Sequence, residues 1–204
     1  LLRNRSDRIA IVGRLENGSR ITLNYGQLYE QVEQCAAAMR SVGVECGDRV
    51  AGFMPNVSET VVAMLATTSI GAIWSSCSPD FGINGVMDRF GQIKPKLLFG
   101  CNGYYYNGKT IDSTPTLQQI CDNIDSIEQL VVVPVIEQLA DLPANGKAVI
   151  FNEFLVSKNT PELAFEQLPF NHPLYIMYSS GTTGVPKCIV HGAGGTLIQH
   201  LKEH

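Results

Sequence analysis

Segments with the composition of buried strands alternate along this chain with segments that repeat their apolar residues at helical spacing. Residues 49–54, 96–99 and 129–133 are apolar runs of strand length, and residues 84–93 and 117–124 have the helical period. Parallel strands need crossover connections, which are usually helices. The order therefore predicts an α/β protein with a helix-covered, largely parallel sheet.

The first part of the chain predicts a hairpin followed by a helix. Strands at 9–12 and 20–23 are joined through Asn17-Gly18, a strong hairpin signal. Asn24 is placed to cap a helix that ends near Gly43. Further along, we expect a helix that ends at Gly71, a strand that begins at Ile73 and another strand over 174–178. We also expect an exposed loop over 103–115 and a connector over 142–173 that contains a short helix at 152–156.

Composition limits the class of protein. With 204 residues, 45% of them hydrophobic, the chain has ample material for a core, and its net charge of −4 argues against a nucleic acid or a membrane surface as partner. It has no apolar run of the roughly 20 residues that cross a bilayer and no signal core, so a cytoplasmic setting is the default. The six cysteines form no C-x-x-C pair, which favours reduced thiols over disulfides or zinc.

The segment from Tyr178 to Lys187 predicts a phosphate-binding loop. Gly181 and Gly184 allow positive φ angles that turn amide N–H groups toward an anion, while Ser179, Ser180, Thr182 and Thr183 add hydroxyl donors. Lys187 supplies a cation suited to a leaving pyrophosphate. The alternative is a polar surface turn. The spacing differs from the Walker pattern, because Val185-Pro186 precedes the lysine and Cys188 follows it, which argues against an ordinary ATPase.

The loop Ser-Ser-Gly-Thr-Thr-Gly-Val-Pro-Lys at 179–187 resembles the signature of the adenylate-forming (AMP-binding) superfamily. Within it, residues 71–82 and 88–96 resemble the acetoacetyl-CoA synthetase subfamily, whereas acetyl-CoA enzymes carry a histidine and a Gly-Gly-Phe run in the first of these stretches. The likeness covers nearly the whole chain and is weakest over 107–171. It implies that residues 1–204 are an incomplete part of the large amino-terminal domain, without its carboxy-terminal portion and lid domain.

The resemblance also implies a reaction. A carboxylate attacks the α-phosphorus of Mg-ATP to form an acyl-adenylate and pyrophosphate, and the CoA thiol then displaces AMP. The expected substrates are acetoacetate, ATP and CoA, with Mg²⁺ as cofactor. Residues 179–184 are expected to hold the ATP phosphates, with Lys187 as the catalytic cation. The adenine, ribose and Mg²⁺ ligands are expected after His204, so the 204-residue piece alone should be inactive.

Three further positions carry weaker expectations. Trp74 either borders an acyl or pantetheine channel or fills the core. Lys109 is a candidate for binding CoA, although Tyr106 stands where the resemblance leads us to expect an arginine. Asp88 and Arg89 are expected to form surface charge on a helix.

Alternatives stay open at this point. The acid could be another short acyl acid, such as acetate or butyrate. A zinc-binding protein is a remote alternative, because His200 and His204 lie one helical turn apart with Glu203 between them. A piece that binds nucleotide weakly or has only a structural role is the non-enzymatic alternative.

Overall fold

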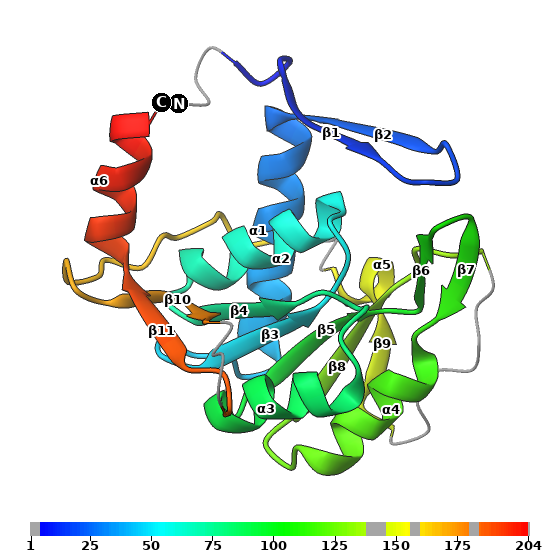
Figure 1. The fold of residues 1–204 in the computed structure, drawn as a ribbon. Coiled ribbons are helices and arrows are strands. Elements are labelled where there is room, and N and C mark those ends of the chain that lie inside the picture. The colour runs from blue at the N-terminus through cyan, green and yellow to red at the C-terminus, as the bar shows by residue number, and fades with distance from the viewer. Residues whose placement is uncertain (1–4, 138–145, 156–159, 180–183, 204) are drawn as a thin grey trace.

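The computed structural model describes residues 5–137, 146–155, 160–179 and 184–203. Its centre is a seven-stranded sheet in the order β11-β10-β4-β3-β5-β8-β9 (Figure 1). Every neighbouring pair is parallel except β10 and β11, which are antiparallel. The predicted α/β class with a largely parallel sheet is therefore confirmed. The seven strands are β3 (Arg49–Phe53), β4 (Ile73–Cys77), β5 (Leu97–Cys101), β8 (Gln129–Val133), β9 (Ala148–Ile150), β10 (Pro173–Tyr178) and β11 (Cys188–Gly192).

Helices cover both faces of this sheet and create two cores. In Figure 1, α1 (Tyr25–Ser41) and α2 (Ser58–Ser69) lie above the sheet, and α3 (Ile83–Ile93) and α4 (Thr114–Asn123) lie below it. Alternate residues of each strand point to opposite faces. Val50 of β3 accordingly belongs to the upper core, and Ala51 belongs to the lower one. The short helix α5 (Phe151–Phe154) completes the upper core, and α6 (Ala193–Glu203) buries none of its residues.

Local signals explain where the first elements begin and end. Asn24 and Gln27 form a capping box at the start of α1, with the Gln27 N–H donating to Asn24 Oδ1 over 2.7 Å. A separate hairpin, β1 (Ile9–Arg14) and β2 (Arg20–Asn24), turns through Gly18 at a φ of 84°. The predicted hairpin and the predicted capped helix are both confirmed.

Two expectations about loops are wrong. The predicted exposed loop over 103–115 contains a second hairpin, β6 (Gly103–Tyr106) and β7 (Lys109–Asp112), which turns through Asn107 and Gly108 at positive φ. The predicted connector over 142–173 contains β9, which pairs with β8. A strand as short as β9 is stabilised by its partner, and its own sequence does not reveal that partner.

Candidate functional site

The loop singled out in the sequence lies at the carboxyl end of β10. Ser179 follows β10, and Lys187 immediately precedes β11. The Ser179 N–H donates to the Lys187 carbonyl over 3.1 Å, which closes the base of the loop. Because β10 is parallel to β4, the loop begins at the sheet edge where ligands of α/β proteins usually bind.

Several predicted phosphate ligands can be placed, and others cannot. Ser179 is half-buried, Lys187 is exposed, and Gly184 has a φ of 96° with no atom of the described residues near the position of a Cβ. Ser180, Gly181, Thr182 and Thr183 lie outside the described residues. Their role in holding phosphates stays a prediction.

A side chain of α3 also contacts the loop. Gln92 Nε2 donates to the Pro186 carbonyl over 2.9 Å. The Cys188 thiol lies 3.6 Å from Gln92 Oε1. Helix α3 thus supports the second arm of the loop, and nothing in the sequence around Gln92 signals this contact.

The last residue of β10 is fixed by a partner from β4. The hydroxyl oxygen of Tyr178 lies 2.9 Å from Ser75 Oγ, and the same Oγ lies 2.9 Å from the Ile176 carbonyl oxygen. Burial raises the pKa of Tyr178 above its ordinary value, so the phenol stays protonated at neutral pH. Since Tyr178 directly precedes Ser179, this contact positions the start of the loop.

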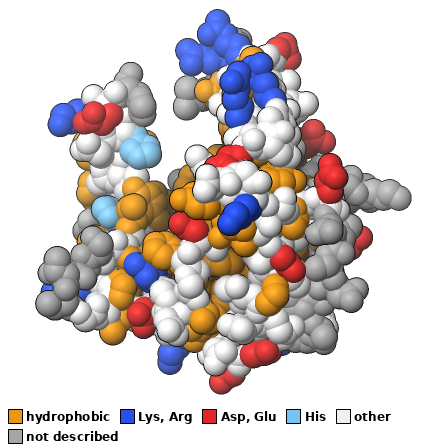
Figure 2. All heavy atoms as spheres, turned by 45° about the vertical axis from the view of Figure 1, so that its right-hand side comes forward, with side chains coloured by type: hydrophobic (Ala, Val, Ile, Leu, Met, Phe, Trp, Pro, Cys, Tyr) orange, Lys and Arg blue, Asp and Glu red, His pale blue; other side chains and the backbone are white. Residues whose placement is uncertain are grey.

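A cavity of about 550 Å³ adjoins Tyr178. Residues of β4 and β10 line it, together with Phe81 from the loop after β4, Arg89 from α3 and His200 from α6. Figure 2 shows apolar side chains gathered in the hollow between the α6 column and the main body. The cavity has the size and the apolar character of a small-molecule site.

Trp74 fills the core and also borders a cavity, and its place in an acyl or pantetheine channel stays a prediction. The residue is 4% exposed and its ring centroid lies 6.3 Å from that of Phe99 in the upper core. It also lines the cavity next to Tyr178. A Cβ at Gly52 would come within 2.6 Å of the Trp74 ring, so glycine at this position allows the ring to approach β3 closely.

Arg89 differs from its expected role as surface charge. It is half-buried, and its guanidinium carbon lies 4.5 Å from the centroid of the Phe81 ring and 5.6 Å from that of Tyr178. Its Nη1 donates to the Gly85 carbonyl over 2.7 Å. Among the described residues it forms no ion pair, with Asp88 or any other carboxylate. The expectation fails because helical periodicity does not reveal rings supplied by other segments.

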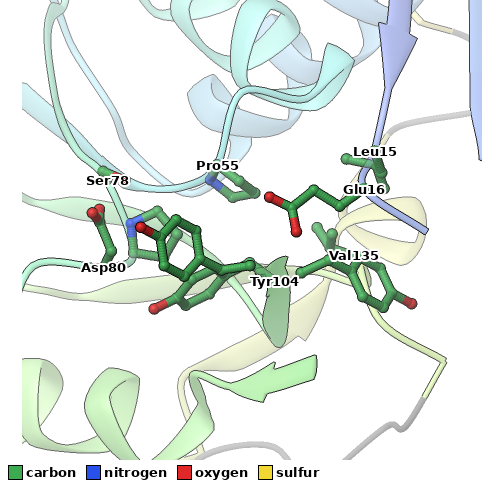
Figure 3. A pocket seen from close by; sticks show the side chains of 10 residues that line it. Leu15, Glu16, Pro55, Ser78, Asp80, Tyr104 and Val135 are labelled. Atoms are coloured by element: carbon green, nitrogen blue, oxygen red, sulfur yellow. The ribbon is translucent and has the colours of Figure 1, made fainter. Parts of the chain in front are cut away.

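A smaller pocket of about 240 Å³ lies where the segments after several parallel strands meet (Figure 3). Asp80 follows β4, Tyr104 to Tyr106 follow β5, and Val135 follows β8. Figure 3 shows Asp80 and Glu16 on opposite sides of the pocket, with Tyr104 between them. The aromatic rings suit a flat ring of a ligand, whereas the two carboxylates disfavour an anion deep inside.

Buried Asn102 holds this pocket together. Its Oδ1 accepts the N–H groups of Val135 over 2.7 Å and Ile136 over 3.1 Å, and its Nδ2 donates to the Ile136 carbonyl over 2.9 Å. The side chain therefore joins the end of β5 to the segment after β8. A buried amide satisfied in this way fixes one arrangement of its neighbours.

Lys109 lies beside this pocket and does not line it. It begins β7 and is paired with Tyr106, which does line the pocket. Lys109 is exposed and is the one cation of the β6–β7 hairpin. Its proposed contact with CoA stays a prediction.

The histidine pair considered for zinc is described only in part. His200 lines the cavity beside Tyr178, and His204 lies outside the described residues. Within the ranges that the structure describes, no three or more His, Cys, Asp or Glu residues gather in a way that would hold a metal ion.

Likewise, no helix among the residues that can be described is long and apolar enough to span a membrane.

Comparisons with known proteins agree with this geometry. A sequence profile described as AMP-binding enzyme matches residues 2–203. The chain is 50% identical to an acetoacetyl-CoA synthetase of Macaca fascicularis, over 100% of its own length and 31% of the relative's. It is 45% identical to the malonamoyl-CoA synthetase vrtB of Penicillium aethiopicum, over 96% of this chain and 28% of that one.

A solved structure extends the comparison to the fold. The acetoacetyl-CoA synthetase from Streptomyces lividans superposes with a TM-score of 0.92 at 37% sequence identity. The match covers 99% of this chain and 30% of that one. The chain thus spans less than a third of the length of these relatives.

Proposed function

The chain belongs to the AMP-binding enzyme family, and from this premise we propose that it is part of an ATP-dependent acid–thiol ligase that converts acetoacetate, ATP and CoA into acetoacetyl-CoA, AMP and pyrophosphate. Residues 1–204 would form an incomplete amino-terminal AMP-binding domain. The observation that carries the proposal is the loop closed by Ser179 and Lys187 beside a cavity for a small acid.

The loop would serve the first half-reaction. The acid's carboxylate oxygen forms a bond to the α-phosphorus of ATP, and the bond from that phosphorus to the bridging oxygen breaks, which releases pyrophosphate. Backbone N–H groups and hydroxyls of residues 179–184 would hold the phosphates, and Lys187 would balance the charge on the departing pyrophosphate. Mg²⁺, when bound to the nucleotide, supplies further neutralisation of the phosphates.

The second half-reaction requires CoA near the same sheet edge. Its sulfur attacks the acyl carbon of the adenylate, AMP leaves, and the thiol proton passes to solvent. The pocket lined by Tyr104 to Tyr106 would take the flat adenine of CoA, with Lys109 outside it for a phosphate. This arrangement keeps the anionic groups of CoA away from Asp80 and Glu16.

The names of two relatives support our proposal for the nature of the acid. Acetoacetyl and malonamoyl groups share a carbonyl at C3, and they differ in the small group beyond it. A cavity of about 550 Å³ has ample room for a four-carbon acid. We therefore extend the proposed substrate class to short acids with a carbonyl at C3.

ATP–pyrophosphate exchange on the complete polypeptide tests the proposal. Exchange should depend on added acid and should be fastest with acetoacetate, with acetate and butyrate as comparison acids. Acetoacetyl-CoA should then appear only when CoA is added. Exchange that is insensitive to acetoacetate would refute the proposal.

A further inference from the structure

The cavity beside the loop contains one cationic side chain among its described lining residues, and we propose that this side chain, Arg89, recognises the C3 carbonyl oxygen of the acyl substrate. Arg89 would thereby be a specificity-determining residue. This inference rests on the proposed function and adds to it the residue that selects among short acids.

The contacts of Arg89 with described residues hold its guanidinium in place and leave several of its N–H donors without a described acceptor. Phe81 and Tyr178 contact it at 4.5 and 5.6 Å from their ring centroids, and the Gly85 carbonyl takes one hydrogen bond. A guanidinium carries five N–H donors. In the part of the chain that the structure describes, the Gly85 carbonyl is its one hydrogen-bond acceptor and no carboxylate pairs with it. A positioned cation with donors to spare suits a ligand acceptor.

The other polar groups of the cavity are less suited to this role. The hydroxyl of Tyr178 is already in contact with Ser75 Oγ at 2.9 Å. Ser76 contributes a neutral hydroxyl, which makes a weaker hydrogen bond than a charged donor. Met64 and Ile176 offer only apolar contact with a methyl or methylene group, and Trp74 adds a neutral, largely apolar ring. Tyr175 and His200 add further polar groups, and Arg89 is the one guanidinium among the described lining residues, so the cavity combines one permanently charged donor with largely apolar walls.

A contact with the reacting carboxylate is the less favourable assignment. A guanidinium paired with that carboxylate would stabilise its charge and weaken it as a nucleophile. The carboxylate must also meet the α-phosphorus, and the loop after Tyr178 is proposed to hold the phosphates next to it. The opposite end of the substrate is then free to reach Arg89, and in acetoacetate that end carries the ketone.

The test compares acetoacetate with butyrate in the complete polypeptide, because the two acids differ chiefly in the C3 oxygen. The measured quantity is the ratio of kcat/KM values for acid-dependent ATP–pyrophosphate exchange. Arg89→Met should lower the acetoacetate-to-butyrate ratio by about 10- to 100-fold, the factor that corresponds to a lost hydrogen bond from a charged donor. Arg89→Lys, which keeps a cationic donor, should retain part of the ratio.

Matched controls separate recognition from packing. Arg40 also lies on a helix and donates one hydrogen bond to a backbone carbonyl, that of Ala164, and it is absent from the lining of the cavity. Arg40→Met should leave the ratio unchanged. Ser76→Ala should change it by less than Arg89→Met does.

Defined outcomes would overturn the inference. Equal losses with both acids in Arg89→Met would assign Arg89 a structural role only, and an unchanged ratio in Arg89→Lys and Arg89→Met would exclude any role in selection. Wild-type preference for malonate over acetoacetate would show that the guanidinium selects a second carboxylate. If Arg89→Met does not fold, the ratio in Arg89→Lys and Arg89→Gln decides. Absence of acetoacetate-dependent exchange in the wild type would instead refute the proposed function.

Discussion

Lys187 is the residue whose predicted role can be tested most directly by experiment. Its backbone carbonyl closes the loop by accepting the Ser179 N–H, so the backbone contact does not depend on the side chain. Its ammonium is exposed at the end of the loop and available to an anion. Truncating the Lys187 side chain therefore tests the role of its ammonium while the backbone hydrogen bond is kept.

We predict that Lys187→Ala slows adenylation more than thiolation in the complete polypeptide. Loss of a positioned cation should lower ATP–pyrophosphate exchange by about 100-fold or more. Conversion of preformed acetoacetyl-AMP to acetoacetyl-CoA should change by only a few-fold. Lys202→Ala is the control, because the Lys202 side chain is 75% exposed on α6. Unchanged exchange in Lys187→Ala would remove the catalytic role assigned to this lysine.

Around the loop, the sequence predicts residues whose role is local and misses those whose role depends on distant partners. Gly184 can be recognised from the sequence because glycine adopts positive φ angles readily, and the structure gives it a φ of 96°. From the sequence alone, Ser75 and Arg89 look like ordinary strand and helix residues. Only the structure shows that both contact Tyr178. Their partner lies about a hundred positions further along the chain, and local pattern has no information about it.

At the scale of elements, the β6–β7 hairpin determines where Lys109 can act. The hairpin turns through Asn107 and Gly108 and pairs Lys109 with Tyr106 at the rim of the tyrosine-lined pocket. The Gly108 N–H also donates to Glu16 Oε2 over 3.4 Å, which links the tips of the two hairpins. Lys109 is thus carried on a paired strand at the edge of the pocket.

From this placement we predict that Lys109→Ala affects CoA and spares adenylation. The KM for CoA should rise about three- to tenfold, because an exposed contact with a phosphate is worth little more than a surface ion pair. Acid-dependent ATP–pyrophosphate exchange should stay within twofold of the wild type. Steady-state kinetics with varied CoA provide the measurement, and Thr110→Ala is the control on the neighbouring position. A KM for CoA equal to that of the wild type would exclude Lys109 from the CoA site.

The elements that the sequence predicts well are those whose signals are complete within a short window. The Asn24 cap and the helix behind it are such a case, as is the turn at Gly18. The turn at Asn107 and Gly108 carries the same signal, but three adjacent tyrosines do not show the alternation of a half-buried strand. Strand β9 forms because it pairs with β8, so the sequence of β9 alone does not predict it.

At the scale of the whole molecule, the burial of cysteines provides a test of the fold. Cys35, Cys77 and Cys101 are buried, whereas Cys46 is exposed. Burial raises the pKa of all three buried thiols, to about 12 for Cys77 and to about 11 for Cys101. A raised pKa lowers the thiolate fraction at pH 8, and the thiolate is the form that reacts.

We predict that iodoacetamide at pH 8 modifies Cys46 first and leaves Cys35, Cys77 and Cys101 unmodified in the native protein. In guanidinium chloride all of them should react at similar rates. Peptide-resolved mass spectrometry measures each site. Rapid native modification of Cys35 would contradict the packing of α1 against the sheet.

The place of β10 in the sheet has a consequence for biosynthesis. Strand β10 pairs with β4, which the ribosome completes nearly a hundred residues earlier, and β4 already lies against β3. A nascent polypeptide can consequently assemble β3, β4 and β5 before Tyr178 leaves the exit tunnel. The loop at 179–187 therefore acquires its position after these strands, and translation that stops short of β10 yields a sheet without the predicted phosphate-binding loop.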